Sequence, residues 1–147
     1  MILTTNKGIE FQIDDEDYDI VSRFSWNLDH KGYVVALSSY LKLHRLVMRI
    51  CDSKIFIDHI NMDKLDCRKL NLRVCTNSQN MSNRLKTKRN TSGYKGVSWH
   101  KSAKKWMASI RFNSKSIYLG LYDDPKDAFD SYKKKSLELQ GEFARFE

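Results

Sequence analysis

Four polar side chains of complementary chemistry follow one another along FIDHINMDKLDCRKLNLRVCTNSQN, residues 56–80. Asp58 is a hard oxygen ligand that suits Mg²⁺ or Mn²⁺, and the carboxamide oxygen of Asn80 can join it on one ion. His59, with an ordinary pKa of about 6.5, is largely neutral at pH 7 and can accept a proton from water. Asn71 stands where a turn enters a strand, a place suited to bracing the loop through hydrogen bonds to the backbone. These are the parts needed to hydrolyse a phosphodiester bond.

A hairpin followed by a helix would position these residues. The β-branched runs KIFID and LRVCT predict two strands, and a short helix is expected over residues 77–85. Together they form a ββα unit over about residues 55–84. Successive strand residues point to opposite faces, so Asp58 and His59 can act on one phosphate only if the strand ends there. The long turn beginning at Ile60 allows such an end.

The segment resembles the HNH endonuclease family, especially the phage and intron-encoded homing type, in LHRLVM, DHINMDKLD, NLRVCT and SQNMSN. The resemblance covers about half the chain. It implies that Asp58 and Asn80 bind one divalent metal ion. It also implies that His59 is the general base and that Asn71 orients it. His44, the histidine of LHRLVM, matches an upstream family histidine and stays open between a core residue and a site member.

One turn position departs from this family. Met62, in DHINMD, stands where relatives often have a glycine, as in DHIDGN. A residue with a side chain at a glycine position can change the loop, and this weakens the case for full activity.

The charge distribution favours a polyanionic partner. The 147-residue chain carries a net charge of +8 and is 12% aromatic, a combination typical of nucleic-acid-binding proteins. Acidic residues crowd the start, between Glu10 and Asp19, whereas no Asp or Glu occurs from Cys67 to Tyr122. A long stretch of one sign predicts a positive track for double-stranded DNA, and no obligate protein partner is evident.

The remaining composition limits the function classes. Cys51, Cys67 and Cys75 form no CxxC pair, so free, buried packing thiols are expected and a structural zinc module is disfavoured. No apolar run is long enough to span a membrane. The N-terminus MILTTNKGIEF lacks a signal-peptide core, which predicts an intracellular protein, in the cytoplasm of a phage-infected bacterial host.

Short elements are expected before the site. Residues 1–13 read as strands around the turn Asn6-Lys7-Gly8, and DDEDYDIVSRF as a short helix. YVVALS and the region around Leu41 and Leu43 look like further strands, and LHRLVMRI like a buried short helix.

The last third of the chain reads as a separate module after the polar segment SNRLKTKRNTSG. YKGVSWH, KKWMASIRF and KSIYLGLY predict three strands. Asp124 as N-cap, Pro125 at the first helical position and Gly141 as the stop delimit a helix with Ala128 and Tyr132 on one face.

Residues 92–147 resemble the APETALA-two (ethylene-response-factor) DNA-binding domain through YKGV, KKWMASIR, YLGLYDDPKDAFDSY and GEFARF. The resemblance implies a sheet laid in the major groove of DNA with the helix behind it. The DNA contacts it implies are Lys95, Trp99, Lys101, Lys105, Trp106, Arg111 and Tyr118. Strand alternation independently puts Lys105 and Arg111 on one face, and leaves Trp106 open between helix packing and a sugar contact.

We therefore expect an α+β chain with a β-rich N-terminal region bearing a ββα-metal motif, then a three-stranded antiparallel sheet packed on one helix. Residues 1–84 would be the nuclease domain, 85–92 a basic linker and 93–147 the DNA-binding domain. Further DNA contacts are expected from Arg84, Lys86, Lys88 and Arg89. The expected function is hydrolysis of DNA phosphodiester bonds with one Mg²⁺ or Mn²⁺ ion, of a homing or nicking type. The alternative is a DNA-binding regulator whose HNH domain has decayed.

Overall fold

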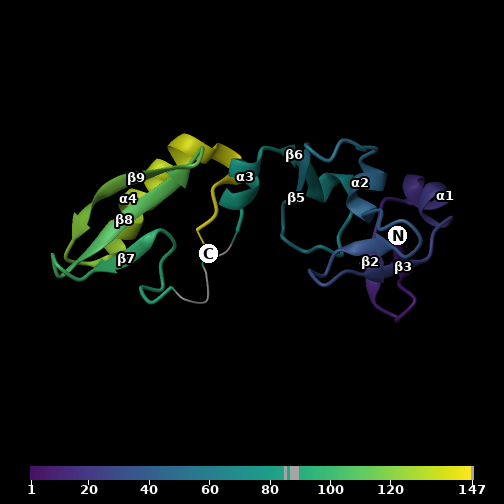
Figure 1. Ribbon diagram of the computed structural model, residues 1–147, viewed down its shortest axis with the longest axis horizontal. Coiled ribbons are helices and arrows are strands. Elements are labelled where there is room, and N and C mark those ends of the chain that lie inside the picture. The colour runs from purple at the N-terminus through teal and green to yellow at the C-terminus, as the bar shows by residue number, and fades with distance from the viewer. Residues whose placement is uncertain (85, 87–89, 147) are drawn as a thin grey trace. The chain divides into compact units, whose positions relative to one another are not determined.

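The computed structural model describes residues 1–84, 86 and 90–146. The chain divides into two compact units, residues 1–76 and 77–147, each with its own apolar core (Figure 1). Small sheets build the first unit, and a three-stranded antiparallel sheet packed on a long helix builds the second. The expected α+β class is confirmed. Within the described residues, no helix has the length and apolar character required to cross a membrane.

Short elements make up the first unit. Its strands pair antiparallel as β1 (Ile2–Thr4) with β2 (Glu10–Gln12), β3 (Trp26–Leu28) with β4 (Val34–Ala36), and β5 (Phe56–His59) with β6 (Leu72–Cys75). Its helical elements are η1 (Asp15–Asp17), α1 (Tyr18–Val21), α2 (Leu43–Val47) and η2 (Lys69–Asn71). The expected strands and short helices are confirmed, with two exceptions. Leu43 begins α2 instead of a strand, and β3 was not expected.

The core of the first unit fixes the elements that carry the site. Leu43 and Val47 are fully buried on one face of α2, because residues four apart lie above one another on a helix. Trp26 packs in the same cluster, and its indole N–H donates to the carbonyl of Val21 at 2.9 Å. Since α2 is anchored on both sides of His44, that histidine is held in one place.

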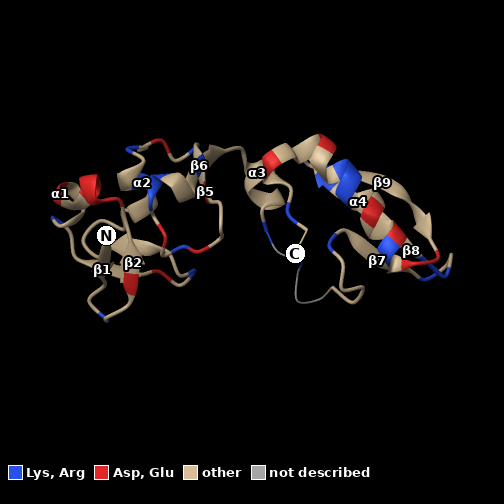
Figure 2. Cartoon of the chain, turned by 180° about the vertical axis from the view of Figure 1, so that it is seen from behind, with Lys and Arg blue, Asp and Glu red and all other residues tan. Residues whose placement is uncertain are grey.

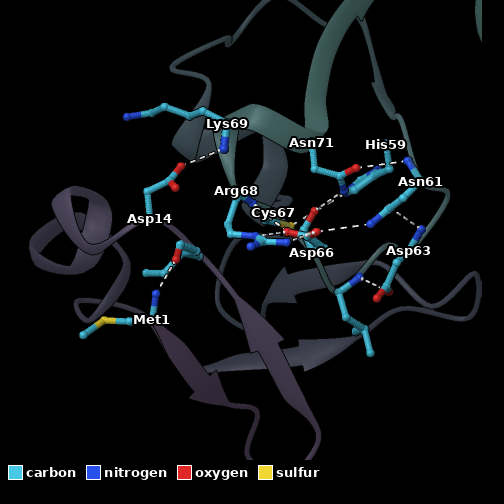
Figure 3. A network of polar contacts seen from close by, with 12 residues as sticks. Met1, Asp14, His59, Asn61, Asp63, Asp66, Cys67, Arg68, Lys69 and Asn71 are labelled. Atoms are coloured by element: carbon cyan, nitrogen blue, oxygen red, sulfur yellow. Dashed lines mark hydrogen bonds and ion pairs between the residues drawn. The ribbon is translucent and has the colours of Figure 1, made fainter.

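The acidic N-terminal segment secures η2, the turn that leads into Asn71. The carboxylate of Asp14 accepts the backbone N–H of Lys69 at 2.7 Å (Figure 3). The ammonium of Lys69 pairs with the fully buried Asp17, 3.1 Å away, and with Glu16. Figure 2 shows this acidic start in red beside α1. The acidic residues therefore have a structural use inside the unit.

The second unit begins with the helix that carries Asn80. Its elements are α3 (Asn77–Ser82), β7 (Val97–His100), β8 (Lys105–Phe112), β9 (Lys115–Tyr122), α4 (Pro125–Gln140) and η3 (Gly141–Phe143). The helix α3 ends at Ser82, before the expected end at Leu85, which lies outside the described residues. The sheet order is β7-β8-β9, and its three strands are the predicted ones.

The α4 helix has the predicted limits. The side chain of Asp124 accepts the backbone N–H of Lys126 at 2.7 Å, Pro125 opens the helix, and Gly141 closes it with φ of 52°. Ala128 is buried against Val97 and Ala108 of the sheet, and Tyr132 is buried beside Gly96. The helix is therefore fixed on the sheet by its apolar face.

No residue with a side chain can replace Gly96, before β7, without a clash. Its φ is +76°, and a Cβ there would lie 2.0 Å from the ring of Tyr132. The glycine of YKGV thus lets the backbone approach α4 closely.

Candidate active site

The β5–β6 hairpin presents the predicted catalytic pair at the end of a strand. Asp58 lies opposite Arg73 and His59 opposite Leu72, and β5 ends at His59. Both Asp58 and His59 are buried, with exposed fractions of 6% and 5%. Strand alternation gives them different neighbours, so the carboxylate and the imidazole are fixed by separate contacts.

The carboxylate of Asp58 is held by Arg73, a residue that the sequence analysis did not select. The Nε and Nη2 groups of Arg73 donate to Oδ2 of Asp58 at 3.1 and 3.0 Å. Both side chains are largely buried, and charge-assisted hydrogen bonds of this kind fix geometry strongly. The signal that could have revealed Arg73 is the hairpin register, which puts the third residue of NLRVCT opposite Asp58.

The imidazole of His59 lies among aromatic and sulfur groups. Its ring centroid is 5.1 Å from that of His44 and 5.9 Å from that of Tyr33, and its Nε2 atom is 3.8 Å from Sγ of Cys67. Burial lowers the pKa of His59, and the nearby charge of Asp58 partly opposes this. The imidazole is therefore largely neutral at pH 7, the form that accepts a proton.

Asn71 makes the hydrogen bonds that a loop brace requires. Its Oδ1 atom accepts the backbone N–H of Asn61 at 3.0 Å, and its Nδ2 group donates to the carbonyl of Asp66 at 2.8 Å (Figure 3). The backbone carbonyl of Asn71 also accepts the N–H of Ile60 at 2.9 Å. The turn that follows His59 is thus tied to η2 at both of its ends.

Asp66 completes this network. Its carboxylate accepts two hydrogen bonds from the guanidinium of Arg68, at 2.8 and 2.7 Å, and one from Nδ2 of Asn61 at 3.1 Å. The side-chain hydrogen bond from Arg68 is the largest of the effects that lower the pKa of Asp66. The loop between the two strands of the hairpin is therefore rigid next to His59.

His44 belongs to the same cluster as His59. It is 5% exposed, and burial lowers its pKa to about 3, with the charges of His59 and Lys42 acting in the same direction. A histidine this far below its usual pKa is neutral at pH 7. Its ring faces His59 edge-on, so it contacts the predicted base directly.

Met62 occupies a left-handed backbone position. Its φ is 64°, and its N–H donates to the carbonyl of His59 at 2.9 Å. The left-handed region costs a residue with a Cβ about 1–2 kcal/mol, which explains why glycine suits this place. The turn forms nevertheless, and it keeps its hydrogen bond to His59.

The cysteines have two different environments. Cys67 and Cys75 are buried, and burial raises the pKa of Cys67 to about 12, so its thiol is protonated beside His59. Cys51 is exposed, so the prediction that it is a buried packing residue is wrong. It follows α2 in a segment without regular structure, which leaves it outside the core.

Asn80, the second predicted metal ligand, lies half-buried on α3 in the unit of residues 77–147. Its joint coordination with Asp58 stays a prediction. In the described part of the chain, no group of three or more His, Cys, Asp or Glu side chains is arranged to hold a metal ion. The two predicted ligands are a carboxylate and a carboxamide, oxygen ligands of the kind that Mg²⁺ and Mn²⁺ prefer over sulfur.

Comparison with known proteins bears on this hairpin. Residues 42–82 match a family model described as HNH endonuclease, and this segment contains α2, the hairpin and α3. The chain belongs to the HNH endonuclease family. Membership of this family implies a DNA substrate and hydrolysis of phosphodiester bonds. Members of the family generally use a divalent metal ion.

Two viral proteins resemble this HNH endonuclease chain. An uncharacterized HNH endonuclease of Acanthamoeba polyphaga mimivirus is 29% identical over 97% of the chain and 77% of its own length. Protein 3.8 of Escherichia phage T7 is 34% identical over 62% of the chain and 74% of its own length. No solved structure matches the chain significantly.

The sheet of the second unit separates the predicted DNA contacts by face. Trp99 lies opposite Trp106, the two rings are 5.0 Å apart, and Trp106 packs against the core on the helix side. Arg111 and Tyr118 are exposed on the other face, where β8 alternation also places Lys105. Basic and tryptophan side chains therefore do not share one surface of the sheet.

The remaining predicted contacts have varied surroundings. Lys101 is exposed between β7 and β8, and Lys105 pairs with Asp123 at 3.1 Å. Arg84 and Lys86 are exposed, whereas Lys88 and Arg89 lie outside the described residues.

Lys95 serves the fold of the second unit. Its ammonium donates to the backbone carbonyls of Ser82, Arg84 and Arg145, at 2.6, 2.7 and 3.1 Å. Burial lowers the pKa of Lys95 to about 8. Its three hydrogen bonds go to the last residue of α3, to the segment after α3 and to the C-terminal segment, so this lysine ties all three to the start of the sheet module.

Proposed function

We propose that the protein is a metal-dependent endonuclease that hydrolyses phosphodiester bonds of double-stranded DNA, acting as a homing or nicking enzyme inside the infected cell. The observation that carries the proposal is a buried, neutral imidazole beside a buried carboxylate at the end of β5. Family membership and the viral relatives support the same reaction class. One active site per chain favours nicking by a monomer, since cutting both strands requires two copies or two passes.

Each residue of the hairpin has a defined part in this proposal. Asp58 and Asn80 would hold one Mg²⁺ or Mn²⁺ ion. When bound, such an ion supplies Lewis-acid stabilisation of the charge that develops on the phosphate. His59 takes the proton of the attacking water through its neutral ring. Asn71 keeps the loop after His59 in place, and Arg73 keeps the carboxylate of Asp58 in one orientation.

We propose a second role for the three-stranded sheet, as a DNA-binding surface of the APETALA-two type. Its outward face carries Lys105, Arg111 and Tyr118, with Lys101 in the adjoining turn. Lysine and arginine neutralise backbone phosphates, and arginine can also read guanine in the major groove. The absence of acidic residues along β7, β8 and β9 supports this surface.

Two observations favour a non-catalytic DNA-binding regulator instead. The guanidinium of Arg73 already neutralises Asp58, and Met62 strains the turn next to His59. A decayed nuclease would retain DNA binding and lack metal-dependent cutting. The two functions therefore differ in one measurable activity.

Incubation of supercoiled plasmid with the full chain tests the proposal. We expect nicked circles with Mg²⁺ or Mn²⁺ and none with a chelator. His59→Ala should slow nicking by about 10²–10⁴-fold, the usual contribution of a general base. Equal rates for both proteins would refute the role of His59, and DNA binding without any nicking would favour the regulator.

A further inference from the structure

We propose that Lys42 and Lys64 form a phosphate-binding site that holds the DNA backbone beside His59. The inference rests on the proposed nuclease function, because it names the side chains that would hold the scissile group there. It concerns only the first unit.

The site is built around the ring of Tyr33. The ammonium groups of Lys42 and Lys64 lie 4.8 and 4.7 Å from the ring centroid. The imidazoles of His44 and His59 contact the same ring, with centroid distances of 5.3 and 5.9 Å. Two cations and the predicted general base thus share one aromatic neighbour.

Three separate segments bring these groups together. Tyr33 directly precedes β4, Lys42 directly precedes α2, and Lys64 lies in the turn between β5 and β6. Both lysines are half-buried. Side chains that converge from distant segments are positioned by the fold, in contrast to lysines that extend singly into solvent.

Within the described residues, neither ammonium has a carboxylate at ion-pair distance. The nearby carboxylates serve the loops. Asp29 accepts two backbone N–H groups, at 2.8 and 2.9 Å, and Asp63 accepts one at 2.9 Å. The ammonium of Lys64 donates to the backbone carbonyl of Lys31 at 2.5 Å, and the carboxylate of Asp29 acts on Lys42 only from beyond ion-pair distance. Both positive charges therefore lie at the ring of Tyr33 without a carboxylate in direct contact.

A phosphodiester supplies what this arrangement lacks. A cation over an aromatic ring is attracted by the negative face of the ring, and its remaining N–H groups can donate to an anion. Lysine binds phosphate as a point charge. The pKa of His59 depends mainly on burial and on the neighbouring carboxylates, and the positive charge of Lys64 lowers it further. A bound phosphate would oppose that field at the imidazole and lie within reach of the base.

The test separates phosphate binding from DNA cutting. The imidazole Cε1–Hε1 NMR signals of His44 and His59 are followed while inorganic phosphate is added to the full chain, against chloride at equal ionic strength. The variants are the double Lys42→Met, Lys64→Met protein and the double Lys→Arg protein. Lys54→Met removes the same charge from an exposed position of the same unit and is the matched control.

We expect phosphate to shift the His59 signal in the native, double-arginine and Lys54→Met proteins, and not in the double-methionine protein. Plasmid nicking should fall about tenfold or more in the double-methionine protein, and the salt dependence of DNA binding should weaken by about one ion per lysine. Retention of both activity and phosphate response by the double-arginine protein shows that the charge, not the packing, is required.

A phosphate response that is absent from the native protein, or that survives in the double-methionine protein, overturns the inference. A native protein that responds to phosphate but never nicks DNA contradicts the proposed nuclease and leaves the phosphate site standing. Normal nicking by the double-methionine protein would show that the two lysines have no role in cutting, and the proposed nuclease function would still stand.

Discussion

The β5–β6 hairpin buries its functional polar residues, whereas the β7-β8-β9 sheet exposes them. In the hairpin, Asp58 and His59 are buried, and fixed partners surround them. On the outward face of the sheet, Arg111 and Tyr118 are exposed. Proton transfer needs a group held in one orientation with a shifted pKa, whereas recognition of DNA phosphates needs cations that can reach them. Burial, more than residue type, therefore distinguishes the two proposed functions.

Removal of Arg73 is expected to impair the hairpin strongly. Arg73→Met leaves the buried Asp58 carboxylate without the guanidinium that orients it. We expect Mn²⁺ affinity and nicking rate to fall about 10–100-fold, the usual result when the partner of a metal ligand is lost. Electron paramagnetic resonance of bound Mn²⁺ measures affinity apart from cutting. If Arg73→Met binds Mn²⁺ more tightly and cuts faster, Arg73 competes with the metal instead of orienting its ligand.

The buried His44 predicts a pH dependence of stability. Its folded pKa of about 3 lies below the unfolded value of about 6.5. A depressed pKa gives stability that is complete above pH 6.5 and is lost as the pH falls towards 3. Between pH 7 and pH 5 the loss from this residue is about 2 kcal/mol.

Urea unfolding of the first unit measures this loss, followed by the indole NMR signal of Trp26. His44→Gln should remove that part of the pH dependence, and His30→Gln, at an exposed position, should retain it. Identical slopes for the native protein and His44→Gln would contradict the buried neutral state.

Lys95 differs from the other basic residues of the sheet module, because it is half-buried and its ammonium is held by three backbone carbonyls. Lys95→Met leaves three carbonyls without their donor, and we expect the second unit to lose about 1–3 kcal/mol. The Trp106 indole signal in urea reports that unit. Lys101→Met, at an exposed turn, should leave stability unchanged. A loss of DNA affinity without a loss of stability in Lys95→Met would make Lys95 a DNA contact after all.

The smallest expected effect concerns the turn beside the hairpin. Met62→Gly relieves a left-handed residue but increases the freedom of the unfolded chain, and the net gain should be about 0.5–1 kcal/mol. Ser53→Gly, where φ is not positive, should destabilise slightly. A destabilised Met62→Gly protein would show that the methionine side chain contributes packing that outweighs the strain.

The sequence predicts the parts of the site that lie in one segment. Asp58, His59 and Asn71 are identified by type, order and spacing, and α4 by its cap and stop residues. Partners across a strand are different. Arg73 requires the hairpin register, and the convergence of Tyr33 with Lys64 requires the whole first unit. Such contacts join residues far apart in the chain, so no local pattern records them.

The sheet module shows the same limit in another form. β-Branched runs and capping residues predict its three strands and its helix, and strand alternation predicts that Arg111 is exposed. Neither pattern predicts that the ammonium of Lys95 binds backbone carbonyls. An ammonium that donates to backbone carbonyls leaves no signature in residue types, because every residue has a carbonyl. Short strands such as β3, with three residues, also carry too little periodicity to be recognised.

The most direct measurement compares the His59→Ala and Arg111→Ala proteins in two assays. One assay is plasmid nicking in Mg²⁺, and the other is binding of a DNA duplex without metal. We expect the His59→Ala protein to bind DNA normally and to lose at least about 100-fold in nicking rate at saturating DNA. We expect the Arg111→Ala protein to bind DNA more weakly and to nick at the native rate once DNA is saturating. A nicking rate of the His59→Ala protein equal to that of the native protein would contradict the proposal that the buried imidazole at the end of β5 activates the water.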